Sequence, residues 1–162
     1  MRRAKQLLSA STLIVTLAAC GGSSSGGGSP LEPQIQGTWL SACQAAPASS
    51  ERLAFTFSGL GFSRMRRTYA NVTCTEPGTV LSTEAGSIVI GARVTVSLGS
   101  TPVTAYPIDA TLVGWTAYDL AYVDTIASPN RLYLGDSSGV NTGNTPATRP
   151  TRLDDTSFWV KQ

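Results

Sequence analysis

Side chains that commonly carry catalysis are sparse in this chain of 162 residues. It contains no histidine, which excludes a Ser-His-Asp triad, a Cys-His pair and an imidazole metal site. No Gly-x-Ser-x-Gly elbow, phosphate-binding loop or EF-hand pattern occurs. Besides Lys5, the only lysine is Lys161, next to the C-terminus. Carboxylates are therefore the remaining candidates for acid–base chemistry.

The ten carboxylates do not form a convincing catalytic pair. A glycosidase needs two carboxyl groups that face one cleft about 5–10 Å apart. Asp119 and Asp124 have opposite parity on one expected strand, and Asp154 and Asp155 are adjacent. Asp136 opens an Asp-Ser-Ser-Gly sequence that suits a Ca²⁺ loop or an ordinary turn. We therefore expect a protein that is not an enzyme, with no cofactor and no metal site.

Arg64, Arg66 and Arg67 form the one local cluster of charge. On a strand, Arg64 and Arg66 share a face and Arg67 points to the other face. One interpretation is a solvated strand that resists aggregation. The other is a docking site for an anionic partner, such as lipopolysaccharide phosphates or an acidic protein.

The N-terminus has the features of an export signal. A basic segment, Met1–Lys5, precedes an apolar segment over residues 7–19, which is too short to span a bilayer as a helix. The segment ends in Leu17-Ala18-Ala19-Cys20, which resembles the lipobox of bacterial lipoproteins. The resemblance implies that residues 1–19 are a signal peptide and that Cys20 is lipidated. The alternative is a plain secretory signal with a chance cysteine.

The lipobox resemblance also implies a location. Gly21, in place of Asp, goes with sorting to the bacterial outer membrane, where acylation of Cys20 gives stable anchoring. We expect the protein to face the periplasm, with surface exposure as the alternative. Residues 20–34 are expected to be the lipidated cysteine and a Gly/Ser tether with a reach of about 20 Å. Without the signal peptide the net charge is −1, so we expect no nucleic-acid partner.

The cysteine count agrees with export. If Cys20 carries lipid, Cys43 and Cys74 remain as a pair, and in an oxidising compartment we expect them to form a disulfide. The alternative is two reactive thiols, but the CxxC spacing typical of such thiols is missing.

Residues 35–162 are expected to form one domain. Tyr106, Ile108, Ala110 and Leu112 alternate with polar residues, which predicts a half-buried strand with these four pointing inward. The same reasoning points Tyr118, Leu120 and Tyr122 inward on the next strand. Similar patterns predict eight strands: 36–43, 52–58, 62–74, 87–98, 104–112, 118–126, 131–135 and 157–161.

Strands at this spacing, with low charge and many Gly, Ser and Thr residues, favour an all-β fold. We predict a single antiparallel barrel of about eight strands, with a β-sandwich as the alternative. The polar segment 136–152 has no periodicity, and its composition favours disorder.

Gly37-Thr38-Trp39, in the first expected strand, resembles the Gly-x-Trp motif of lipocalin-like (calycin-type) barrels. The resemblance implies that Trp39 plugs the barrel, with an arginine near the last strand stacked on it: Arg131, Arg149 or Arg152. The chain is also similar to small bacterial lipoproteins of unknown role that share GTWxxxC and RLYxGD segments. The alternative is a core tryptophan in an unrelated sandwich.

The sequence is compatible with two different functions. The first is a binding module for a small apolar or amphipathic ligand, held in the barrel. The second is a protein-interaction or structural role in the envelope, such as inhibition of a host enzyme. A hollow barrel would favour the first function, and a barrel filled by its own rings would favour the second. The aromatic residues expected to line a ligand cavity are Trp115, Tyr69, Tyr106, Tyr118 and Tyr122.

Overall fold

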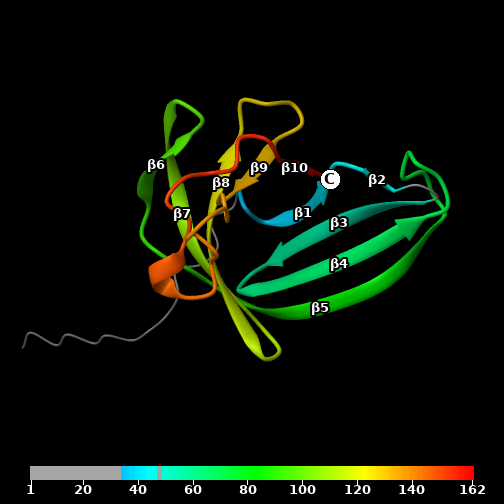
Figure 1. Ribbon diagram of the computed structural model, residues 1–162, viewed down its shortest axis with the longest axis horizontal. Helices are drawn as coiled ribbons and strands as arrows, with labels where there is room; N and C mark the ends of the chain where they lie inside the picture. Colours follow the sequence, from blue (N-terminus) through cyan, green and yellow to red (C-terminus); the bar gives the residue numbers. More distant parts are fainter. Residues whose placement is uncertain (1–33, 47–48) are drawn as a thin grey trace, which may run out of the picture.

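The computed structural model describes residues 34–46 and 49–162. Eight antiparallel strands close into a barrel in the order β1, β10, β9, β8, β7, β5, β4, β3, and β3 pairs back with β1 (Figure 1). The predicted all-β barrel is therefore confirmed. The only helix in the described ranges is a single 3-10 turn, Pro146–Thr148. The barrel strands are β1 (Gly37–Ser41), β3 (Ser49–Ser58), β4 (Gly61–Tyr69), β5 (Gly78–Ile90), β7 (Thr101–Leu112), β8 (Trp115–Asp124), β9 (Arg131–Leu134) and β10 (Trp159–Lys161).

Two further strands lie outside this ring. β2 (Gln44–Ala46) pairs with β3, and β6 (Val94–Leu98) pairs with β7. The segment 87–98, expected to be one strand, is thus the end of β5 followed by β6. The backbone N–H of Gly91 donates to the carbonyl of Pro107 at 2.8 Å, at the point where β5 has ended. Because β5 ends here, β6 can leave the barrel wall. It pairs with the first half of β7, whereas β5 pairs with the second half.

Three strands project from the barrel as an arm (Figure 1). The arm comprises Ser49–Leu53, Arg66–Tyr69 and Gly78–Ser82, where β3, β4 and β5 pair with one another but not with β1 or β7. At Gly86, near the place where β5 joins the barrel wall, a Cβ would clash with the Thr111 carbonyl oxygen. Glycine therefore permits the close approach of β5 to β7 there.

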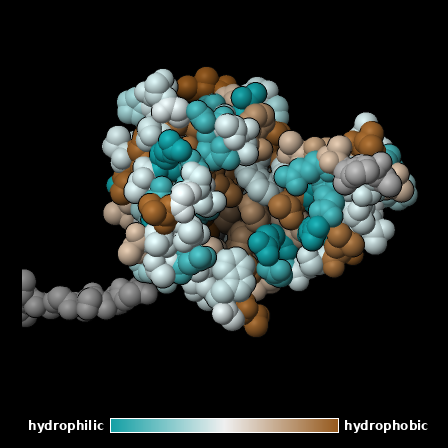
Figure 2. Space-filling view, in the orientation of Figure 1, coloured by the Kyte–Doolittle hydropathy of each residue, from teal (hydrophilic) through white to brown (hydrophobic). Residues whose placement is uncertain are grey.

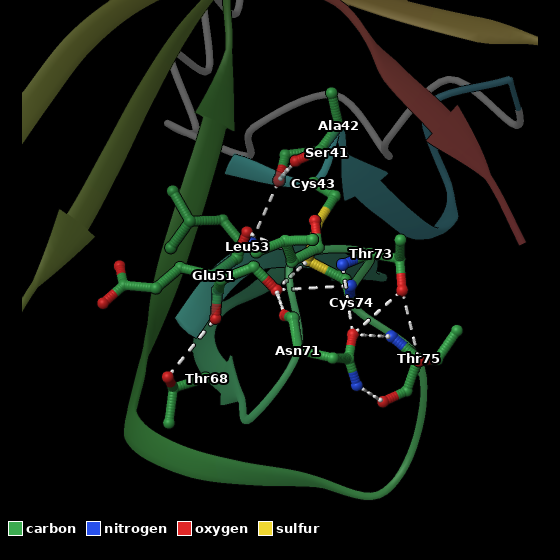
Figure 3. Close-up of a disulfide and its surroundings, with 12 residues drawn as sticks. Ser41, Ala42, Cys43, Glu51, Leu53, Thr68, Asn71, Thr73, Cys74 and Thr75 are labelled. Atoms are coloured by element: carbon green, nitrogen blue, oxygen red, sulfur yellow. Dashed lines mark hydrogen bonds between the residues drawn. A yellow bond between two sulfur atoms is a disulfide. The ribbon is translucent and has the colours of Figure 1, made fainter. Parts of the chain in front are cut away.

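A disulfide joins the arm to the chain that follows β1 (Figure 3). Cys43 lies between β1 and β2, and Cys74 lies between β4 and β5, with 5.7 Å between their Cα atoms. Beside it, the buried Ser50 hydroxyl donates to the Asn71 carbonyl and accepts from the Cys74 backbone N–H at 3.2 Å. The predicted pairing is confirmed. By closing a loop of 31 positions it contributes about 3–4 kcal/mol in the chain-entropy model.

The β8 strand is apolar on both faces because two separate cores flank it. Ala121 and Val123 belong to the barrel core, whereas Leu120 belongs to a smaller core outside the barrel. The prediction that Tyr118, Leu120 and Tyr122 point inward is therefore wrong. Alternation alone cannot distinguish the faces of a strand when both are covered. The outer core comprises Ala105, Leu120, Tyr133 and Leu153, with Val96, Leu98, Val103, Tyr122 and Phe158 packed against it.

The segment 136–152 is held against the barrel by hydrogen bonds, so the predicted disorder is wrong. The Gly143 carbonyl accepts from the Tyr118 N–H at 2.8 Å. The Arg149 guanidinium donates to the carbonyls of Ile108 and Asp119 at 2.9 and 2.8 Å. A polar composition is compatible with order here because backbone groups of β7 and β8 supply the partners. Within the described ranges, no helix has the length and apolarity required to cross a membrane.

Candidate ligand site in the barrel

Trp39 is fully buried and belongs to the barrel core. Its indole N–H donates to the carbonyl of Ile35, also fully buried, at 2.8 Å. The Nζ of Lys161 lies 5.3 Å from the centre of the Trp39 ring. Trp39 and Lys161 are direct partners in the β1–β10 register, which places their side chains on the same face. The cation on Trp39 is therefore the lysine of the last strand.

None of the three arginines suggested as the partner of Trp39 has that role, so this expectation is wrong. Arg131 lies over the ring of Phe158, 4.3 Å from its centre. Arg149 binds the β7 and β8 carbonyls, and Arg152 forms an ion pair with Asp136. The arginines belong to the outer face of the barrel and to the segment packed on it.

A hollow of about 150 Å³ opens beside the barrel core, and we call it the aromatic hollow. In the β3–β4 register Phe57 pairs with Phe62 and Phe55 with Arg64, which directs these side chains to one face of the sheet. Trp115, at the start of β8, is half-exposed and forms part of the wall. The full lining is Phe55, Phe57, Phe62, Arg64, Ile108, Ala110, Leu112, Trp115, Ala117, Asp119 and Leu134.

A second hollow of about 400 Å³ shares two wall residues, Asp119 and Leu134, with the first. We call it the polar hollow. The space-filling view shows a recess between the barrel and the arm, with apolar surface in its depth (Figure 2). The polar hollow is lined by Ser41, Ala42, Gln44, Leu53, Asp119, Leu134, Gly135, Ser137, Asp154, Thr156, Ser157, Phe158 and Trp159.

Asp119 lies where the two hollows meet. Its Oδ1 accepts hydrogen bonds from the backbone N–H groups of Leu120 and Gly135, at 2.7 and 2.9 Å. Burial raises the pKa of Asp119 to about 6, although these two hydrogen bonds and the charge of Arg149 act in the opposite direction. A Cβ at position 135 would lie 2.5 Å from Oδ1 and 2.4 Å from the Pro150 side chain. Glycine at 135 therefore allows the carboxylate to be held in this position.

The three clustered arginines are each paired with a glutamate. Arg64 donates to both carboxylate oxygens of Glu84, at 2.8 and 3.1 Å, and lies 5.6 Å from the centre of the Trp115 ring. Arg66 pairs with Glu51, and Arg67 pairs with Glu76. The pKa of Glu76 is lowered, mainly by the Gly78 backbone N–H and then by Arg67. Each arginine of the cluster thus has a carboxylate partner, and docking of an anionic partner at this cluster stays a prediction.

The structure does not bring the five predicted aromatic residues together. Trp115 lines the aromatic hollow, whereas Tyr69 is buried in the arm against Gly78. Tyr106 is buried in the barrel core, where its hydroxyl accepts from Gln34 at 3.0 Å. The other two are on the outside: Tyr118 lies beneath Arg149, and Tyr122 stacks on Tyr133.

Sequence reasoning missed the residues that form the hollows. The sequence predicts strands over 52–58 and 62–74, but nothing in it marks Phe55, Phe57 or Phe62 as site residues. Asp119 was considered only as half of a catalytic pair. Asp119 lies on the same strand face as Ala117 and Ala121, and a single carboxylate on an inward face would have indicated a site. The sequence shows this only if the inward face of β8 is assigned correctly.

Comparisons with protein-family models, with curated proteins and with solved structures found no match to this chain. In the part of the chain that the structure describes, no group of three or more His, Cys, Asp or Glu side chains is arranged to hold a metal ion. Cys20, the expected signal peptide over residues 1–19 and almost all of the expected tether lie outside the described residues.

Proposed function

We propose that this protein binds a small apolar or amphipathic ligand in the aromatic hollow of its barrel. The observation that carries the proposal is the hollow itself, which has phenylalanine and tryptophan rings on its walls and a single carboxylate at one side. Concave sites with mostly apolar walls and a few convergent polar groups are typical of ligand-binding proteins.

The size of the hollow limits the ligand. A cavity of about 150 Å³ accommodates one benzene-sized ring or a short aliphatic group. A larger ligand has room to extend into the polar hollow, because Asp119 and Leu134 line both spaces. The geometry therefore favours a ligand with a compact apolar end and a polar end over a long fatty acid.

We propose further that the protein is a lipid-anchored lipoprotein of the bacterial outer membrane with a lipocalin-like barrel. The lipobox-like Leu17-Ala18-Ala19-Cys20 segment supports the anchor, and the closed barrel with Gly37-Thr38-Trp39 in its first strand supports the lipocalin-like comparison. The anchor would hold a binding barrel next to the membrane, where amphipathic molecules concentrate.

Lipidation can be tested with Cys20→Ser. In cells given an alkyne fatty acid, the wild-type chain should be labelled and sediment with membranes, because acyl chains on Cys20 give stable anchoring. The variant should lose the label and leave the membrane fraction. The matched control, Ser23→Ala in the expected tether, should behave as wild type. Labelling of the Cys20→Ser variant would contradict the proposal.

Ligand binding can be tested by calorimetry with toluene, an apolar molecule of the size that the aromatic hollow accommodates. We expect saturable binding by the purified protein. Ala117→Leu adds side-chain volume to the aromatic hollow and should weaken binding about tenfold or more, since the added carbons occupy space that the ligand needs. Thr116→Leu is the control because the neighbouring side chain points to the opposite face. Absence of saturable binding, or equal effects of the two variants, would contradict the proposed site.

A further inference from the structure

The two hollows differ in charge, which indicates what kind of polar group a ligand carries. The polar hollow has two carboxylates on its wall, Asp119 and Asp154, and no lysine or arginine among its lining residues. Asp154 accepts from the backbone N–H and the hydroxyl of Thr156, at 2.8 and 2.6 Å, and the hydroxyl is the main cause of its lowered pKa. Asp154 is therefore charged at neutral pH, and the polar hollow has an acidic wall.

Asp119 is the carboxylate that a ligand in the aromatic hollow can also reach. Only its Oδ1 takes part in the hydrogen bonds described above, and among the described residues no ion pair is formed by this carboxylate. Arg149, the cation that lowers its pKa, binds the Asp119 carbonyl and forms its ion pair with Asp109 instead. The carboxylate thus lacks the paired cation that buried carboxylates usually have.

The one cation on the aromatic hollow is already paired. Arg64 makes both of its described charged contacts with Glu84, and its guanidinium lies over Trp115. A ligand carboxylate would have to compete with Glu84 for Arg64, whereas a ligand cation would find Asp119 without a competing partner.

We propose that the ligand is an amphipathic amine whose apolar end occupies the aromatic hollow and whose ammonium group binds the carboxylate of Asp119. This inference rests on the proposed function, since it names the class of ligand for the same site. The fixed position of the carboxylate, held by two backbone N–H groups, means that little reorganisation is needed when the ammonium group arrives.

The test uses three probes with one apolar tail and different polar groups: 4-phenylbutylamine, 4-phenyl-1-butanol and 4-phenylbutyrate. Their affinities for the purified protein are measured by calorimetry at about pH 7.5. We expect the amine to bind about tenfold or more tightly than the alcohol, because the ammonium group adds an opposite charge to the hydrogen bond that either probe can donate to the carboxylate. The butyrate should bind most weakly, because its charge repels Asp119 and Asp154.

Variants separate the role of Asp119 from general binding. Asp119→Asn keeps the size of the side chain and an acceptor oxygen for the backbone N–H groups, and should remove the preference for the amine over the alcohol. Asp155→Asn, an exposed carboxylate that lines neither hollow, should leave the preference unchanged. The alcohol should bind wild type and both variants alike, which shows that the hollow is intact.

Lowering the pH gives a second readout. Asp119 loses its charge as the pH falls through about 6, so the amine should lose affinity there while the alcohol does not. The groups that face Asp119 are Arg149 from the packed segment, Arg64 with Glu84 across the aromatic hollow, and Asp154 across the polar hollow. Arginine does not titrate in this range, and Asp154 has a lowered pKa, so the change would report on Asp119.

Each outcome decides one claim. Equal affinity for amine and alcohol, or tighter binding of the butyrate, would overturn the amine inference and leave the proposed function intact. If neither the three probes nor toluene bound, the proposed function itself would fail. An amine preference that persisted in Asp119→Asn would overturn the assignment of Asp119.

Discussion

Replacing Trp39 with alanine should lower the free energy of unfolding by about 3–5 kcal/mol, the range for truncation of a buried large aromatic residue. Trp39 is fully buried in the barrel core, and its indole N–H satisfies the buried carbonyl of Ile35. The variant would therefore leave both a cavity and an unpaired acceptor. Lys161, which lies over the ring, would lose its aromatic partner as well.

Urea unfolding followed by circular dichroism measures this loss. Trp115→Ala is the matched control, because Trp115 is half-exposed at the wall of the aromatic hollow and should cost about 1 kcal/mol or less. Equal losses for the two variants would show that burial of Trp39 does not hold the barrel together.

Asp119→Asn should have the opposite sign and raise the free energy of unfolding at about pH 7 by about 1–3 kcal/mol. The folded-state pKa of Asp119 is about 6, against 3.8 for the unfolded chain. A raised carboxyl pKa means that the ionised side chain destabilises the folded state above pH 6, by about 1.4 kcal/mol for each unit of the shift. Asparagine is uncharged, so the variant is free of this cost.

The pH dependence of the difference follows from the same values. As the pH falls from about 6 to 4, the folded protein takes up a proton at Asp119 before the unfolded chain does, so wild type gains stability. The advantage of Asp119→Asn should therefore shrink over this range and vanish below about pH 4. A constant difference between pH 7 and pH 4, or a less stable variant at pH 7, would contradict the burial of this charge. Asp155→Asn should change stability little at either pH.

The effects of Asp119→Asn on stability and on amine binding have opposite signs and one cause, the buried carboxylate. A carboxylate that destabilises the fold and lines a cavity is a candidate for function, since groups with strongly perturbed pKa values gather at such sites. Removing it should stabilise the protein and weaken the binding of the ligand, the exchange expected when a site is maintained at the cost of stability.

The barrel could be predicted from the sequence because its strands alternate. The run from Tyr106 to Leu112 has one buried and one less buried face, so a period of two is visible. The first half of β5, Gly78–Ala85, was missed because most of its residues are exposed, which removes the alternation. β8 was found but assigned the wrong inward face, because the outer core covers its other side.

The site was less predictable than the fold. The aromatic hollow combines phenylalanines of β3 and β4 with Asp119 and Trp115 of β8, segments that are distant in the sequence and adjacent only after closure of the barrel. Residue type alone suggests tyrosines as lining residues, whereas strand parity and the outer core place Tyr118 and Tyr122 elsewhere. The importance of Asp119 depends on burial, which the sequence does not display.

A crystal structure of the purified protein grown with 4-phenylbutylamine tests the central claim most directly. We expect electron density for the phenyl ring between Phe55, Phe62 and Trp115, with the amine nitrogen at about 2.7–3.2 Å from a carboxylate oxygen of Asp119. Side chains that fill the hollow, or an amine bound only outside the barrel, would contradict the account.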